Sequence, residues 1–265
     1  MGEAQAQVQA VVGRSPISQG IERSRWWLAG IGQQIEWFKG AAMSTIWRTL
    51  KALQVVYKRG RSYLHSPDPD YATKLAYIAA CVERVRTDPG RYVLLYEDEL
   101  TYYRRATVSS NYVLEGSDGP RAEQGWTRNR KGRIAAALDL SSGRVLSYQA
   151  TILGRRALGR FYQQIEAAYP QAERIFLVLD NWPVHFHADL IRQLTASRIE
   201  LVRLPTYAPW TNPVEKLWRK LYAEILHLHP FGDHWSALQQ AIQHWLAQYA
   251  TGSSDLLRYV GLYPP

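Results

Sequence analysis

Two short apolar segments, 92–96 and 174–179, most constrain what this chain can fold into. Both have the length and the Tyr, Val, Leu, Ile and Phe content of strands that are buried on both faces of a sheet. Between them, Ser-Ser-Gly at 141–143 is a turn signal flanked by apolar runs, which predicts a hairpin. Strands that first form a hairpin and then alternate with helices indicate a mixed α/β sheet with helices on its faces.

The connector 66–70, Ser-Pro-Asp-Pro-Asp, is stiff and unsuited to a helix, so we expect a domain boundary there. A helix is expected at 71–86, which makes 66–90 a linker and helix and 91–265 the α/β domain. The further strands expected are 134–140, 144–151 and 199–204. The further helices expected are 157–169, 187–197, 213–228 and 235–249.

The segment 23–65 predicts a small helical domain. Apolar residues recur at helical spacing over 24–39, and Gly40 fits the position that follows a helix. Ser44 is a suitable N-cap for a helix at 45–54. Two helices joined by a short glycine-containing turn suggest a helix-turn-helix.

The flanks of that helical pair are less regular. Residues 55–61 predict a short strand that runs into a basic turn, as in a winged domain. Residues 1–22 are rich in Gln, Ala and Gly with weak periodicity, and we expect a flexible N-terminal segment there.

Charge favours a polyanionic partner. The formal net charge is +9, although a soluble enzyme that happens to be basic would share this excess. The segment 44–65 carries no acid and five basic residues: Arg48, Lys51, Lys58, Arg59 and Arg61. A helix with polar and basic residues beside a basic loop suits a DNA major groove and its flanking phosphates. The alternative is an ordinary helical hairpin with a solvated basic face.

Three carboxylates stand at the ends of predicted elements. Asp98 follows the apolar segment 92–96, Asp180 follows 174–179, and Glu215 lies in the first turn of the helix expected from residue 213. Open α/β sheets bind ligands at the carboxyl ends of their strands. Carboxylate oxygens suit Mg²⁺ or Mn²⁺ better than zinc. Each acid also has a structural explanation: a turn for either aspartate, and a capping box for Glu215.

Histidines offer a rival metal site. His185 and His187 are two residues apart, and His227, His229 and His234 gather later in the chain. Zinc sites prefer Cys/His combinations at tighter spacing, and the single cysteine is remote, which disfavours zinc. The single cysteine also excludes an intrachain disulfide. Without a signal-peptide pattern at 1–13 or an apolar run of about 18 residues, we expect a cytoplasmic protein.

Three segments carry a resemblance to a known family. The sequence LDNWPVH at 179–185 resembles the second-aspartate motif of bacterial transposases of the IS630 group, within the Tc1/mariner superfamily. LPTYAPWTNPVEKLW at 204–218 resembles the third motif, which is long and specific, and YEDEL at 96–100 matches the first. Thirty-four residues lie between Asp180 and Glu215, a spacing typical of the superfamily. The resemblance runs from about residue 23 to the C-terminus.

The resemblance implies an RNase H-like catalytic fold preceded by a helix-turn-helix. It implies a DNA transposase that cuts transposon ends and joins the 3′-OH to target DNA at TA, with two Mg²⁺ ions (or Mn²⁺) held by Asp98, Asp180 and Glu215. Asp98 is chosen over Glu97 and Glu99 by the motif alone. The implied partner is double-stranded DNA, bound by a homodimer in the nucleoid of a bacterial cytoplasm. Many members have two helix-turn-helix units, whereas one is convincing here.

Basic residues near the acids are expected to line a DNA track, or else only to keep the surface soluble: Arg104, Arg105, Arg128, Arg130, Lys131 and Arg133. Trp182 and Trp210 either stack on unpaired bases or anchor packing. Two other functions stay open. An RNase H-like nuclease of another class would lack strand transfer, and a non-cutting regulator that occupies transposon ends would lack metal-dependent nicking.

Overall fold

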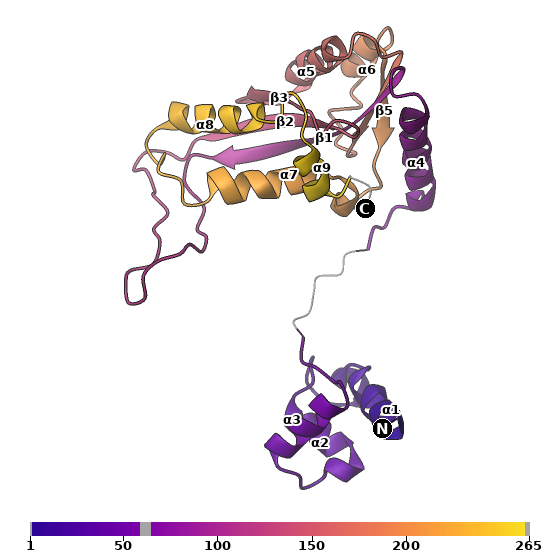
Figure 1. The fold of residues 1–265 in the computed structure, drawn as a ribbon, viewed down its shortest axis with the longest axis vertical. Helices are drawn as coiled ribbons and strands as arrows, with labels where there is room; N and C mark the ends of the chain where they lie inside the picture. The colour runs from indigo at the N-terminus through magenta and orange to yellow at the C-terminus, as the bar shows by residue number, and fades with distance from the viewer. Residues whose placement is uncertain (1, 59–64, 263–265) are drawn as a thin grey trace. The chain divides into compact units, whose positions relative to one another are not determined.

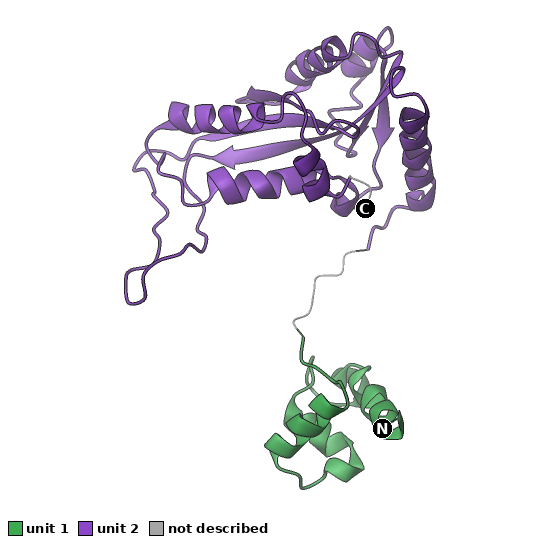
Figure 2. Ribbon diagram, viewed as in Figure 1, with its two compact units in different colours: residues 1–63 green, residues 64–265 purple. Residues whose placement is uncertain are grey.

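The computed structural model describes residues 2–58 and 65–262 of the chain. Its contacts divide the chain into two compact units, 1–63 and 64–265 (Figure 2). Each unit has an apolar core of its own. Within the described ranges, no helix has both the length and the apolar character needed to cross a lipid bilayer.

Unit 1 is a bundle of short helices. They are α1 (Gly2–Val12), α2 (Leu28–Gln34) and α3 (Met43–Ala52), with 3₁₀ turns η1 (Pro16–Gln19) and η2 (Glu36–Phe38). Its buried core consists of Val8, Ile31, Ile35, Phe38, Ile46, Leu50 and Leu53. The amphipathic pattern of α3 turns Ile46 and Leu50 inward, whereas Trp47 next to Ile46 is 53% exposed.

The N-terminal segment 1–22 differs from the flexible segment expected. Most of it is ordered as α1 and η1, and Val8 in α1 is fully buried. The helical period is weak in the sequence because only a few apolar positions of α1 face the core, among many Gln and Ala residues. The side chain of Trp37 donates a hydrogen bond of 2.8 Å to Gln7, which adds a polar contact between η2 and α1.

The helix expected over 24–39 is shorter, because α2 begins after Trp27 and gives way to η2 at residue 36. Gly40 has a φ of +77°, which confirms the turn predicted there. The strand expected from residue 55 does not form in 55–58. Arg59 and Arg61 lie outside the described residues, so the expected basic turn is untested.

Unit 2 is built on one five-stranded sheet in the order β3-β2-β1-β4-β5 (Figure 1). The strands are β1 (Tyr92–Tyr103), β2 (Lys131–Asp139), β3 (Val145–Ala150), β4 (Arg174–Leu179) and β5 (Ile199–Arg203). β2 is antiparallel to β1 and β3, while β4 is parallel to β1 and β5. The predicted mixed sheet flanked by helices is confirmed.

Helices cover both faces of this sheet. One face packs against α4 (Tyr71–Thr87), α7 (Val214–Leu221), α8 (Trp235–Ala247) and α9 (Ser254–Val260), and the other against α5 (Arg155–Ala168) and α6 (Ala188–Leu194). Side chains alternate along a strand, so in β1 Leu94 and Tyr96 enter the first core and Leu95 enters the second.

The segment 66–90 is part of unit 2 rather than a linker region of its own. Ile78, Cys81 and Val85 of α4 are buried in the first core. The Asp68 carboxylate forms an ion pair of 2.6 Å with Lys74 and accepts a hydrogen bond of 2.7 Å from the Thr206 backbone N–H. These two contacts lower the pKa of Asp68. Asp68 therefore fastens the connector to the chain that follows β5.

Two further details of unit 2 concern the predicted elements. Gly143 in the predicted hairpin turn has a φ of +69°, and a Cβ there would lie 2.3 Å from the Ser253 carbonyl oxygen, so the turn needs glycine. The helix expected over 213–228 ends at Leu221 and continues as a π-helical turn, η4 (Tyr222–Leu226). The helix α9 was not expected.

If α1 belongs to the core of unit 1, replacing Val8 with Ala should destabilise that unit by about 2 kcal/mol, because two buried methyl groups are lost and a cavity remains. Hydrogen exchange of the α3 amides in the full chain would measure the change. Val56→Ala is the matched control, since Val56 is 59% exposed. Equal exchange in the two variants would mean that α1 contributes nothing to the core.

Candidate active site

The central strand β1 is longer than the sequence predicted. We expected it to end at Tyr96 with Asp98 beyond it, but β1 continues to Tyr103, so Asp98 lies inside the strand. Parallel pairing with β4 covers only Tyr92–Tyr96, whereas antiparallel pairing with β2 covers Leu95–Tyr103. Past Tyr96, therefore, β1 has a strand neighbour on one side only.

The three predicted acids lie together at this place. Asp98 from β1, Asp180 directly after β4 and Glu215 in the first turn of α7 line one pocket of 510 Å³, closed on another side by residues 204–209. The sequence predicted their convergence, although it placed Asp98 at the end of a strand rather than within one.

Asp98 lies on the face of β1 that packs against α7. The indole Nε1 of Trp218 donates a hydrogen bond of 2.9 Å to its Oδ2. Burial, followed by the negative charges of Glu215 and Glu99, raises the pKa of Asp98 to about 7. The pocket therefore disfavours the charged carboxylate unless a cation compensates it.

Glu215 is positioned through Asn212, a buried side chain that contacts β1. Its amide donates a bond of 2.9 Å to the Glu97 carbonyl oxygen, and its Oδ1 accepts one of 3.2 Å from the Val214 N–H. The Asn212 N–H donates to Pro209, not to Glu215, so Glu215 does not serve the predicted capping box. Burial raises the pKa of Glu215, Arg219 opposes this effect and Asp180 adds to it.

Asp180 lies in a tight turn, which is the structural explanation that the sequence offered for it, and its side chain also faces the pocket. Its Oδ1 accepts a bond of 2.8 Å from the Trp182 N–H and lies 3.5 Å from Nε2 of His185. Burial raises the pKa of Asp180, but the nearby His185 imidazole and the hydrogen bond from the Trp182 N–H outweigh burial and lower it. Asn181 donates to the Leu204 carbonyl oxygen at 2.8 Å, which ties this turn to the chain after β5.

The donor set of this pocket fits divalent cations. Asp98, Asp180 and Glu215 supply only carboxylate oxygens, the ligands that Mg²⁺ and Mn²⁺ prefer. Two of the three have raised pKa values, because burial and mutual repulsion leave their negative charge poorly compensated. A cation bound among them would remove that repulsion.

The predicted basic residues near the site differ in exposure. Arg105, Arg128, Arg130 and Lys131 are exposed, and Arg133 is half-buried. Arg104 is 4% exposed. Its guanidinium donates a hydrogen bond of 2.7 Å to the Thr127 carbonyl oxygen and another to the Thr127 hydroxyl. This corrects the expectation that Arg104 lines a DNA track, because its guanidinium braces the two ends of the loop between β1 and β2.

The two tryptophans near the acids both make packing contacts. The ring of Trp182 meets that of His185 edge-on, with centroids 5.4 Å apart. Trp210 is half-exposed and donates a bond of 3.2 Å to the Tyr71 hydroxyl. These contacts favour the anchoring interpretation for both.

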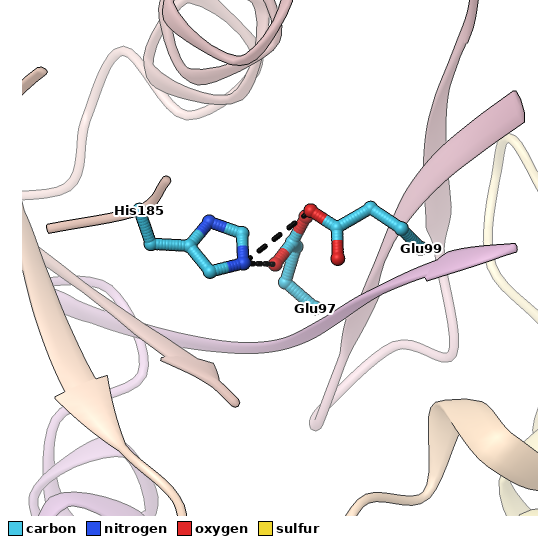
Figure 3. A group of neighbouring side chains, drawn as sticks. All are labelled: Glu97, Glu99 and His185. Atoms are coloured by element: carbon cyan, nitrogen blue, oxygen red, sulfur yellow. Dashed lines mark ion pairs between the residues drawn. The ribbon is translucent and has the colours of Figure 1, made fainter. Parts of the chain in front are cut away.

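A second polar cluster, which the sequence analysis missed, lies on the opposite face of β1. It consists of Glu97, Glu99 and His185 (Figure 3). Each residue offers one atom that could bind a metal, and these three atoms lie within 4.8 Å of one another. Burial lowers the pKa of His185, but the Asp180, Glu99 and Glu97 carboxylates raise it to about 10. The two-residue spacing of Glu97 and Glu99 within a strand was the available signal. Among the described residues, the later histidines join no such group.

Comparison with known proteins identifies the family. A family model described as DDE superfamily endonuclease matches residues 93–236, more than half of the chain. The chain is 24% identical over 242 residues to the insertion element IS630 uncharacterized 39 kDa protein of Shigella sonnei, spanning 90% of this chain and 69% of that protein.

Solved structures agree with the fold. The Mos1 transposase paired-end complex with the left transposon end matches with a TM-score of 0.68 and 15% identity, over 97% of this chain and 74% of that chain. The Mos1 mariner paired-end complex with Mn matches with a TM-score of 0.65 and 16% identity, over 97% of this chain and 74% of that chain. These likenesses agree on the fold, and the family model shows that the chain belongs to the DDE superfamily endonucleases.

Proposed function

We propose that this protein is a DNA transposase that cuts transposon ends and joins the freed 3′-OH to target DNA at TA dinucleotides. The observation that carries the proposal is the convergence of Asp98, Asp180 and Glu215 in one pocket. The Mos1 structures of the same fold include a paired-end complex and a strand transfer complex, which supports the same chemistry here.

In this mechanism Asp98, Asp180 and Glu215 would hold two divalent ions, Mg²⁺ or Mn²⁺. Such ions, when bound, activate the attacking oxygen and stabilise the leaving one in an in-line displacement at phosphorus. The chain supplies no nucleophile, since water attacks first and the freed 3′-OH attacks later. Trp218 fixes one oxygen of Asp98, and Asn212 fastens α7 so that Glu215 faces the pocket.

DNA binding is assigned to both units. In unit 1, α2 and α3 would form the helix-turn-helix, with the exposed Arg48 and Lys51 of α3 in the major groove. Lys58, Arg59 and Arg61 would hold flanking phosphates. In unit 2, the DNA track would consist of Arg105, Arg128, Arg130, Lys131 and Arg133. Two copies would act together on the two transposon ends.

The convergent triad argues against one of the two rival functions, the non-cutting regulator. A non-cutting regulator has no need of three acids that face one pocket at the cost of mutual repulsion, as Asp98 and Glu215 do. A nuclease of another class would share the pocket, so transfer of the 3′-OH to a target duplex is the decisive activity.

Replacing Asp180 with Asn should abolish metal-dependent cleavage of a transposon-end duplex and leave DNA binding almost unchanged, because the amide keeps the shape and loses the charge that holds a cation. Nicking and electrophoretic binding assays measure the two properties. Asp255→Asn is the control, since that side chain is 90% exposed on α9. Near-normal nicking by the Asp180 variant would refute the proposed role.

Mn²⁺ affinity should rise with pH through pH 7 and level off only above it. Asp98, with a pKa raised to about 7, is protonated below that value, and the proton must leave before the carboxylate can bind a cation. Calorimetry between pH 5.5 and 8.5 should therefore show proton release on Mn²⁺ binding that declines above pH 7. Affinity that does not change between pH 6 and pH 8 would contradict this assignment.

Replacing basic residues of unit 1 should weaken DNA binding in two different ways. Arg48→Ala should cost roughly 1–3 kcal/mol on the transposon end and much less on random DNA, because base contacts specify sequence. Lys58→Ala should weaken binding to both DNAs and lower the slope of affinity against salt by about 1. Salt titrations on both DNAs measure this difference. Equal losses for Arg48→Ala on both would show that α3 does not read the sequence.

A further inference from the structure

The cluster on the far face of β1 contains buried polar atoms without partners. Glu97 is fully buried and neither of its carboxylate oxygens has a hydrogen-bond partner. Oε1 of Glu99 and Nε2 of His185 are likewise buried and unpartnered. Buried carboxylates of this kind are strongly destabilising unless a proton or a counter-charge, such as the His185 imidazolium or a metal ion, compensates them.

His185 is oriented toward these carboxylates. Its Nδ1 forms a hydrogen bond of 2.8 Å with the Tyr162 hydroxyl of α5. Its Nε2 then lies 3.4 Å from Oε1 of Glu99 and 3.9 Å from Oε2 of Glu97 (Figure 3). A histidine that binds a metal through one nitrogen commonly has the other nitrogen held by such a hydrogen bond.

We propose that Glu97, Glu99 and His185 form a second cation site, separate from the pocket of Asp98 and Glu215, for a divalent transition metal such as Zn²⁺ or Mn²⁺. Ligands bound at about 2.1 Å in a tetrahedron lie about 3.4 Å apart, close to the separations observed here. Two carboxylates and one imidazole favour Zn²⁺ or Mn²⁺ over Mg²⁺. One ion would take one ligand atom from each of the three residues.

The site would connect two parts of the catalytic unit. Glu97 and Glu99 belong to β1, whereas His185 lies in the segment between β4 and α6. The same Nε2 is 3.5 Å from Oδ1 of Asp180, so the cluster adjoins the pocket through that side chain. An ion there would hold the turn of Asp180 against the central strand. This role adds to the proposed function and does not depend on it.

Nitrogen coordination that also depends on Glu99 separates this site from the catalytic pocket, because the three pocket acids supply only oxygen and Glu99 is not one of them, although His185 also lies 3.5 Å from Asp180. Metal-free Asp98→Asn/Glu215→Gln protein is loaded with Mn²⁺, and electron spin echo spectroscopy records coupling to ¹⁴N. A parallel sample is loaded with Zn²⁺, dialysed and analysed for zinc per chain. We expect imidazole coupling or one retained Zn²⁺, lost when His185→Gln is added and kept with His187→Gln, the matched control two residues away.

Glu99→Gln is a second variant, because Glu99 is less buried than Glu97 and its replacement disturbs packing less. It should weaken Mn²⁺ or Zn²⁺ binding at this site at least 10-fold in protein that circular dichroism shows to be folded. The proposal is overturned if neither metal gives a signal that depends on both His185 and Glu99, since protons then hold the cluster together. Failure of the proposed function would instead appear as wild-type protein without cleavage, whatever the ¹⁴N result.

Discussion

The active site depends on the unequal pairing of β1 with its two neighbours. β4 ends at Leu179, while β2 accompanies β1 through Tyr103. Beyond Tyr96, the edge of β1 that β4 leaves open is where the chain after β4 and the start of α7 approach. Had β4 been several residues longer, it would have covered this edge, and neither Asp180 nor Glu215 could share a pocket with Asp98.

Alternation along the same strand gives three consecutive acids two different environments. Asp98 points to the α7 face, where Trp218 donates to it, while Glu97 and Glu99 point to the α5 face, where His185 lies. A shift of one residue in the register of β1 would exchange these environments. The long antiparallel ladder with β2 fixes that register, and so decides which carboxylate faces the pocket.

The sequence predicted the sheet from its apolar segments, and the acids from their place at element ends together with the family motifs. It could not predict that β1 continues through Glu97–Glu99, because acidic residues normally mark a strand end and the continuation depends on distant pairing with β2. The order in 1–22 depends likewise on tertiary burial of Val8, and the burial of Arg104 on Thr127, 23 residues away. Local patterns carry no information on such long-range contacts.

Two asparagines hold the backbone around the pocket, one at the open edge of β1 and one after β5. Asn212 donates to the backbone of β1, and Asn181 donates to the backbone after β5. An amide satisfies a buried carbonyl group without adding charge, whereas a lysine or arginine at either position would partly neutralise the nearby carboxylates. Neutral donors therefore close the pocket and preserve its negative potential. Burial first, and then the neighbouring negative charges, raise the pKa of Asp98 and Glu215, and those charges would also make the pocket bind divalent cations.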